Sequence, residues 1–146
     1  MRIDDQKWRG RFLGVAHEVA TWSKDPSTKV GCVIVSPDGV IVATGYNGLP
    51  RGVDDLPERM ERPIKYIWTV HAEAAAVANA ARTGVRLNGA TAFVSHAPCA
   101  GCARLMINAG VSCIAVGGGS TSMPQEEFEA AAVMFAEAGV EVERLG

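Results

Sequence analysis

Several features are absent from this 146-residue chain, and each absence argues against a class of protein. No apolar run approaches the about 18 residues that a membrane-spanning helix needs. The first residues, MRIDDQKWRGRF, lack the apolar segment of a secretory signal. Basic residues are not in excess, because 14 Lys and Arg stand against 16 Asp and Glu, for a net charge of −2. We therefore expect a cytoplasmic protein that binds neither a membrane nor long nucleic acid.

Internal repeats, linkers and low-complexity tracts are also missing, and the length predicts one domain over residues 1–146. The composition, with 48% hydrophobic and 21% charged residues, is typical of a globular domain. A chain of this size can bury a core without disulfides. Its four cysteines, in a reducing compartment, therefore indicate metal binding rather than cross-links.

Hydrophobic periodicity predicts the elements of the first half. A helix is expected over 5–22, because apolar residues recur there at spacings of three and four. Its predicted buried face consists of Trp8, Phe12, Val15, Ala16 and Val19. Two β-branched runs around the turn sequence SPDG predict a hairpin over 29–46. Residues 47–67, rich in Pro and Gly, are predicted as a long loop, and such loops are often functional.

The second half alternates helices with strands. Helices are expected over 72–82 and 99–109, each closed by a glycine. Ser122 and Gln125 predict a capping box for a last helix, which buries Phe128, Ala132 and Phe135 and ends before Gly139. Strands are expected over 90–95, 111–116 and 140–145. Because several strands are continuously apolar, helices must cover the sheet, which predicts an α/β fold.

Two short motifs contain the residue types of a metal site. TVHAEAAAV places His71 and Glu73 at the start of one predicted helix, and SHAPCAGCARL places Cys99 and Cys102 at the start of another. Helix N-termini carry free N–H groups and a partial positive charge, which favour thiolates. A spacing of three puts both sulfurs on one side of the first turn, where they can chelate one ion.

One histidine and two cysteines make a three-ligand zinc site, which leaves the fourth position open for water, as in catalytic centres. Cys32 and Cys113 lie inside apolar strands and are interpreted as buried structural thiols. A His-x-Glu motif followed after 24 residues by Pro-Cys-x-x-Cys is the signature of zinc-dependent nucleobase deaminases. In such a site zinc lowers the pKa of bound water, the hydroxide attacks the carbon that bears the amine, and Glu73 transfers the protons.

Longer segments carry a closer resemblance. SKDPSTKVGCVIV, GYNGLPRG, HAE and PCAGCARLMINAGV, in this order over roughly residues 8–116, resemble the deoxycytidylate (dCMP) deaminase family. The resemblance implies a three-layer α/β/α cytidine deaminase-like fold with a mixed five-stranded sheet. It further implies hydrolysis of dCMP to dUMP and ammonia, with Zn²⁺ as the cofactor. A homo-oligomer, hexameric in that family, and dCTP and dTTP as allosteric effectors are also implied.

The resemblance assigns roles to individual residues. His71, Cys99 and Cys102 are expected to bind zinc, and Glu73 to transfer protons. The expected substrate contacts are Asn47 at the sugar or base, Ala72 and Ala97 at the base, and Ser23, Lys24, Thr28 and Arg51 at a phosphate. The alternative for these last four is a plain solvated loop. His96 either lines the pocket or is a hydrogen-bonded structural histidine.

The chain departs from the family pattern at Ala75, where Asn is common, at Ala97, where a large aromatic is common, and at glycines 117–119. Ala97 enlarges the base pocket unless Trp68 or Trp22 fills the space. The alternative substrates are therefore a modified cytosine nucleotide, a free base or nucleoside, and a pterin- or triazine-like ring. Residues 54–63 are a lid, a subunit contact or a solvated loop, and we favour the last two.

A non-enzymatic alternative is a structural-zinc module that binds a protein or nucleic acid. This alternative predicts four protein ligands to the metal and loss of the fold without it. It also predicts a basic surface, which the net charge of −2 does not favour.

Overall fold

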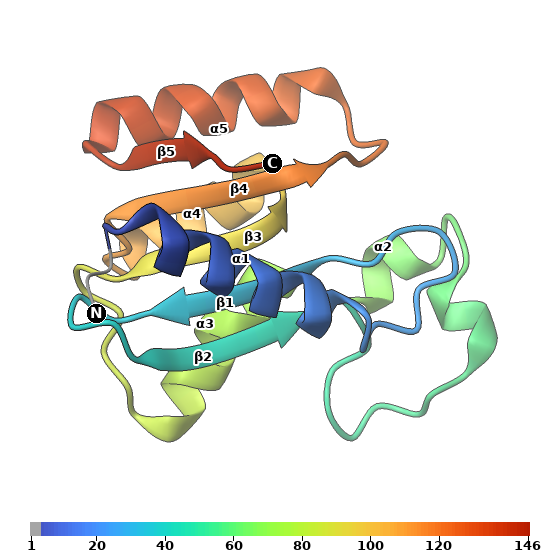
Figure 1. Ribbon diagram of the computed structural model, residues 1–146. Coiled ribbons are helices and arrows are strands. Elements are labelled where there is room, and N and C mark those ends of the chain that lie inside the picture. Colours follow the sequence, from blue (N-terminus) through green and yellow to red (C-terminus); the bar gives the residue numbers. More distant parts are fainter. Residues whose placement is uncertain (1–3) are drawn as a thin grey trace.

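A mixed five-stranded sheet forms the middle layer of the computed structural model, which describes residues 4–146 (Figure 1). The strand order is β2-β1-β3-β4-β5. β1 (Gly31–Val35) pairs antiparallel with both β2 (Ile41–Tyr46) and β3 (Thr91–His96). β3 pairs parallel with β4 (Cys113–Gly119), which pairs parallel with β5 (Glu141–Arg144). The predicted mixed sheet of five strands is confirmed.

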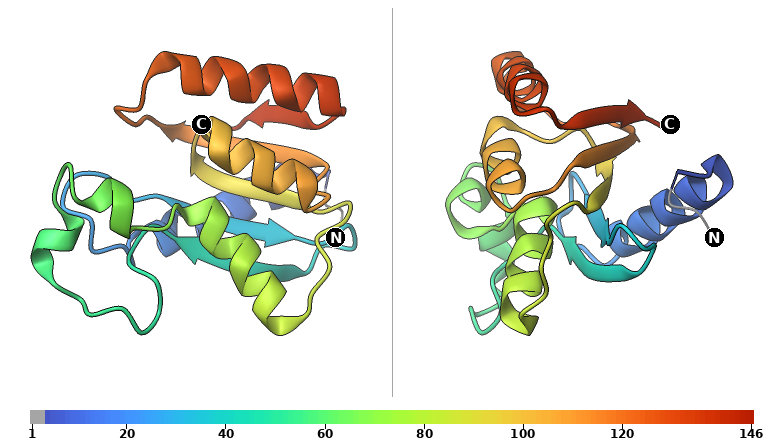
Figure 2. Two further views of the ribbon diagram at one scale, coloured as in Figure 1. Left: turned by 180° about the vertical axis from the view of Figure 1, so that it is seen from behind. Right: turned by 90° about the vertical axis from the view of Figure 1, so that its left-hand side faces the viewer.

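Helices cover both faces of this sheet. α1 (Gln6–Ala20) lies on one face, and α3 (Ala72–Thr83), α4 (Ala100–Asn108) and α5 (Gln125–Ala138) lie on the other (Figure 2). The three-layer α/β/α arrangement is therefore confirmed. None of the helices formed by residues 4–146 has the length and apolarity that crossing a membrane requires.

The side chains of β1 explain why two helical layers are needed. Val33 and Val35 point into a cluster under α1, whereas Cys32 and Ile34 point into the larger cluster under α3, α4 and α5. All five residues of β1 are buried. A strand that is apolar on both sides is stable only when both faces of the sheet are covered.

The first helix is shorter than its periodicity predicted. Its N-cap is Asp5, whose carboxylate accepts a hydrogen bond from the Lys7 N–H at 2.9 Å, and it ends at Ala20. Leu13 belongs to the buried face, but Val15 is 37% exposed, so the predicted burial of Val15 is wrong. The remaining predicted residues of that face are buried or half-buried.

The last helix differs from its prediction at both its start and its face. The N-cap is Pro124, and no side chain caps it, so the capping box of Ser122 and Gln125 is wrong. Ala131 and Phe135 are buried, whereas Ala132 is exposed and Phe128 is only half-buried. Because helical residues 131 and 135 are four apart, they share the face that meets the sheet.

The segment predicted as a long loop contains two short helices. These are the 3-10 helix η1 (Pro57–Met60) and α2 (Lys65–Trp68). The Lys65 ammonium, buried at 6% exposure, forms an ion pair with the Asp25 carboxylate at 2.9 Å. The pair attaches α2 to the loop that follows α1, at the end of the sheet where β3 and β4 finish (Figure 1).

Candidate active site

The starts of α3 and α4 deliver the predicted metal ligands. His71 is the N-cap residue of α3 and Cys99 is the N-cap residue of α4, both with extended backbone. Cys102 lies in the first turn of α4, on the same side as Cys99. Both helices therefore begin at one place, and their unpaired N–H groups favour anionic ligands there.

His71 Nδ1 lies from both cysteine sulfurs at the distance that a tetrahedral zinc ion requires. His71 Nδ1 lies 3.5 Å from Cys99 Sγ and 3.4 Å from Cys102 Sγ. Zinc bonds of about 2.05 Å to nitrogen and 2.3 Å to sulfur, at a tetrahedral angle, place such atoms about 3.5 Å apart. All the ligand atoms of the cluster lie within 4.8 Å of one another. The donor set and its geometry both fit zinc.

The side chains of this cluster also stabilise the thiolate form of Cys99. The Cys102 thiol and His71 hydrogen-bond to the Cys99 sulfur, and these contacts lower the pKa of Cys99 to about 4 although burial opposes the shift. The same hydrogen bond to Cys99, together with burial, raises the pKa of Cys102. The hydrogen bond between His71 and the adjacent Cys99 sulfur raises the pKa of His71. A thiolate is the form that ligates zinc.

Cys32 and Cys113 stand apart from the ligand cluster. Cys32 is fully buried in β1, and burial raises the pKa of its thiol. Cys113 is half-buried in β4, where its sulfur accepts a hydrogen bond from Arg9 at 3.4 Å. Among residues 4–146 neither belongs to a metal-ligating group, so the ligand count remains three. The predicted burial is confirmed for Cys32 and is wrong for Cys113, and neither thiol closes the site as a fourth ligand.

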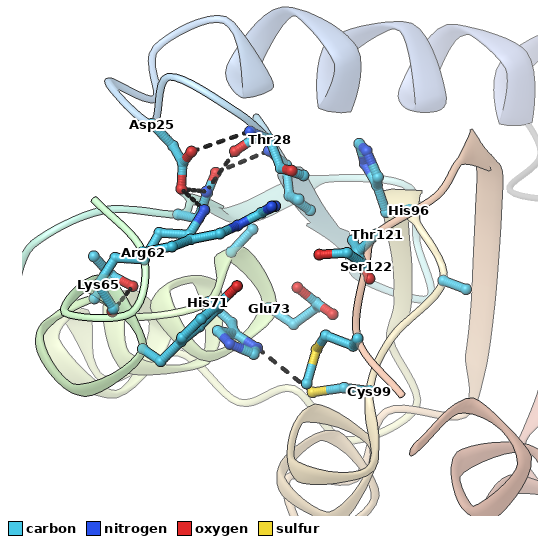
Figure 3. Close-up of a pocket in the computed structure, with 17 residues that line it drawn as sticks. Asp25, Thr28, Arg62, Lys65, His71, Glu73, His96, Cys99, Thr121 and Ser122 are labelled. Atoms are coloured by element: carbon cyan, nitrogen blue, oxygen red, sulfur yellow. Dashed lines mark hydrogen bonds and ion pairs between the residues drawn. The ribbon is translucent and has the colours of Figure 1, made fainter. Parts of the chain in front are cut away.

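Glu73 lies beside the cluster without belonging to it. It is 4% exposed, and it lines the same pocket as His71 and Cys99 (Figure 3). Burial raises the pKa of Glu73 to about 7. A buried carboxyl that opens onto a pocket is in the right place to exchange protons with a ligand there.

Several predicted substrate contacts line this pocket. They are Thr28, Asn47, Ala72, His96 and Ala97. The Asn47 side chain also organises the wall, because its Oδ1 accepts from the Val30 N–H at 2.8 Å and its Nδ2 donates to the Thr28 carbonyl at 2.9 Å.

Other predicted contacts lie outside the pocket. Ser23 is buried and donates to the Asn47 carbonyl at 2.7 Å. The exposed Lys24 pairs with Asp55, and the Arg51 guanidinium donates to Asn79 at 2.7 Å.

Trp68 is 40% exposed, with a guanidinium from η1 over its ring, and so does not fill the space beside Ala97. Trp22, which is 52% exposed, does not fill it either.

Sequence reasoning missed several residues of the wall. Asp25, Arg62, Lys65, Thr121 and Met123 all line the pocket. The available signal was weak: two basic residues near the end of a segment with several prolines, and two polar residues after a glycine run. The segment 54–63, interpreted as a subunit contact or a solvated loop, thus contributes Arg62 to the pocket.

The glycine run at 117–119 is explained by the histidines beside it. A Cβ atom on Gly119 would come within 3.0 Å of three atoms of the His96 ring, closer than real Cβ atoms approach. The His96 Nδ1 lies 2.7 Å from the Ser95 hydroxyl, which accepts the Gly31 N–H at 3.0 Å. His96 therefore both lines the pocket and is held by the sheet.

This fold and this cluster define the cytidine deaminase-like class of proteins. The sheet order, the layers and the His–Cys–Cys group at two helix starts all agree with that class. The chain belongs to the cytidine and deoxycytidylate deaminase family, because the family model for the zinc-binding region, "Cytidine and deoxycytidylate deaminase zinc-binding region", matches residues 6–118.

Individual relatives agree with this assignment. The chain is 42% identical over 139 residues to an uncharacterized deaminase in the luxG 3′ region of Aliivibrio fischeri, covering 93% of this chain and 92% of the relative. It is 37% identical over 145 residues to the deoxycytidylate deaminase of Mus musculus, covering 95% and 80%. Among solved structures, the dCMP deaminase of cyanophage S-TIM5, in complex with dCMP and dUMP, superposes with a TM-score of 0.81. That match is 24% identical and covers 97% of this chain and 98% of the other, so it shows the fold.

Proposed function

We propose that this chain is a zinc-dependent hydrolase that converts dCMP and water into dUMP and ammonia. One observation carries the proposal: a His–Cys–Cys group, whose two nitrogen–sulfur distances fit a tetrahedral zinc ion, lies at a pocket that also contains a buried carboxyl, Glu73, outside the group. A structural site would occupy the fourth position with protein, and a binding module would not need an acid at that place. The family membership supports the same reaction.

A zinc ion held by His71, Cys99 and Cys102 supplies Lewis-acid activation of water at neutral pH. Glu73 then acts as the proton carrier of the reaction. Its carboxylate takes a proton from the attacking water and delivers it to the ring nitrogen next to the amine-bearing carbon. A second transfer to the departing amine releases ammonia, and the carbon keeps the oxygen as a carbonyl. Because Glu73 is buried, bulk water competes little for these protons.

The walls beside Glu73 are suited to hold a planar ring. Ala72 and Ala97 line the pocket with small side chains, and the Ala72 N–H belongs to the first turn of α3. Asn47 also lines the pocket, and its Oδ1 retains a second lone pair for the sugar or base. His96 presents a neutral ring, because burial lowers its pKa. We infer that these residues contact the substrate.

A second candidate substrate class rests on Ala97. It lines the pocket where a large aromatic is common in the family, and neither Trp22 nor Trp68 lies in the space beside it. The same chemistry on a bulkier amine-bearing ring, such as a modified cytosine nucleotide or a pterin, would use that space.

An ammonia-release screen over cytosine, deoxycytidine, dCMP, guanine, a pterin and an aminotriazine distinguishes dCMP from these alternative substrates. We expect dCMP to be the best substrate by kcat/KM. Preference for a bicyclic or unphosphorylated ring would overturn the dCMP assignment and leave the deaminase chemistry intact.

A further inference from the structure

One cation in the pocket has no protein partner. Arg62 lies between η1 and α2, and it lines the pocket (Figure 3). Its side chain extends from that segment over the pocket that holds His71, Glu73 and Cys99. Within residues 4–146, its guanidinium makes no hydrogen bond or ion pair. An exposed guanidinium that overhangs a pocket is free to bind an anionic ligand there.

The other nearby cations are already neutralised or lie elsewhere. Lys65 is paired with Asp25 at 2.9 Å and donates to the Ser27 hydroxyl at 2.9 Å, and both members of the pair are buried. Lys24 and Arg51 bind Asp55 and Asn79, and neither lines the pocket. Arg62 is therefore the pocket cation whose charge remains available, and the Asp25–Lys65 pair holds the segment that carries it.

A second observation comes from the wall formed after β4. The Thr121 hydroxyl is buried and has no hydrogen-bond partner among the described residues. Thr121 lines the same pocket as Arg62 (Figure 3). An unpaired buried hydroxyl costs free energy unless a ligand or a water satisfies it. The pocket thus offers a cation and a spare hydroxyl in addition to the groups that meet the ring.

We propose that Arg62 binds the 5′-phosphate of the nucleotide substrate and so selects a nucleoside monophosphate over the nucleoside, with the Thr121 hydroxyl as a further donor. The proposal rests on the proposed deamination of dCMP. A guanidinium can donate two parallel hydrogen bonds to one phosphate, which gives both affinity and orientation. A neutral sugar hydroxyl would gain much less from this residue.

The test compares wild type, Arg62→Gln, Arg62→Lys and the matched control Arg51→Gln, all loaded with zinc. For Arg62→Gln we expect kcat/KM for dCMP to fall by about tenfold to a hundredfold, because a charge-assisted contact is lost. Turnover of deoxycytidine should stay within about twofold of wild type, since it has no phosphate to lose. Arg62→Lys should fall between, because an ammonium keeps the charge but not the paired hydrogen bonds. Arg51→Gln should match wild type on both substrates.

Binding of the product provides a measurement that does not depend on turnover. Titration calorimetry should show weaker binding of dUMP by Arg62→Gln than by wild type, with equal binding of deoxyuridine. Equal dUMP affinity in the two proteins, or an equal loss for dUMP and deoxyuridine, would overturn the role of Arg62 while leaving deamination standing. A wild-type protein that releases no ammonia from dCMP or deoxycytidine would instead refute the proposed function itself.

Discussion

Glu73 is the residue on which the proposed chemistry depends most. It shares the pocket with the ligand cluster, it is 4% exposed, and it is absent from the group of atoms that could hold the metal. These three facts distinguish the proposed proton carrier from the candidate metal ligands. They also make its role testable by a change that keeps the shape of the side chain.

Replacing Glu73 with Gln should leave zinc bound and stop ammonia release. The amide fills the same space but cannot carry the proton, and loss of general acid–base transfer costs about 10²- to 10⁴-fold in rate. The measurement is zinc per chain by elemental analysis, together with ammonia released from dCMP. Glu18→Gln, on the exposed side of α1, is the matched control and should be fully active. Loss of the metal from the Glu73 variant would make Glu73 a ligand and the mechanism wrong.

Sequence alone predicted the ligand residues but not the far wall of the pocket. Cys99 and Cys102 were predictable as a pair because a spacing of three at a helix start has a fixed geometry, and His71 because it belongs to the His-x-Glu motif. Arg62 and Thr121 come from separate segments, and only the folded chain brings them to one pocket. Lys24 and Arg51 had the right charge, but their neighbours Asp55 and Asn79 hold them outside it.

At the scale of elements, the position of α3 depends on a close approach to β2. A Cβ atom on Gly45 would come within 3.0 Å of the Ala72 carbonyl oxygen and of the Ala76 nitrogen. Glycine therefore lets the helix that begins with the ligand His71 lie directly against the strand. A glycine also allows a close approach at Gly31, where a Cβ atom would meet the backbone of α1.

Gly45→Ala should therefore displace the start of α3 and weaken the metal site. We expect a loss of about 1–3 kcal/mol in the free energy of unfolding, because the added methyl group meets backbone that cannot rotate away. Zinc retention during dialysis should fall with it. The control is Gly14→Ala on the exposed side of α1, where a Cβ atom has nothing within 4 Å. That change should stabilise the protein by about 0.5–1 kcal/mol through helix propensity. Equal unfolding midpoints for Gly45→Ala and wild type would show that α3 can shift without cost.

The elements themselves were predictable where local signals agree. The hairpin, the helices that start at the ligand motifs and the central strands all follow from periodicity and glycine stops, and α3 does end at Gly84 with φ 73°. The start of α5 was not predictable in this way. Ser122 and Gln125 have the spacing of a capping box, but the helix begins only after Pro124. Tertiary packing, which sequence periodicity does not report, decided that Ala131 and not Ala132 faces the sheet.

At the scale of the whole molecule, the site combines parts from the entire chain. The loop after α1, the segment with η1 and α2, the starts of α3 and α4 and the segment after β4 all contribute residues to the pocket. The proposed zinc ion would join two of these parts, because His71 comes from the start of one helix and both cysteines from another. A homo-oligomer and nucleotide effectors stay predictions from the resemblance.

The most direct test of the central claim measures zinc content and the products formed from dCMP in the same preparation. The account predicts about one zinc per chain, as the three-ligand cluster requires. It predicts equal molar amounts of dUMP and ammonia, loss of both after removal of the metal with a chelator, and recovery when zinc is restored. A protein that forms dUMP and ammonia at full rate after its zinc has been removed, or that holds one zinc per chain and leaves dCMP unchanged, would contradict the account.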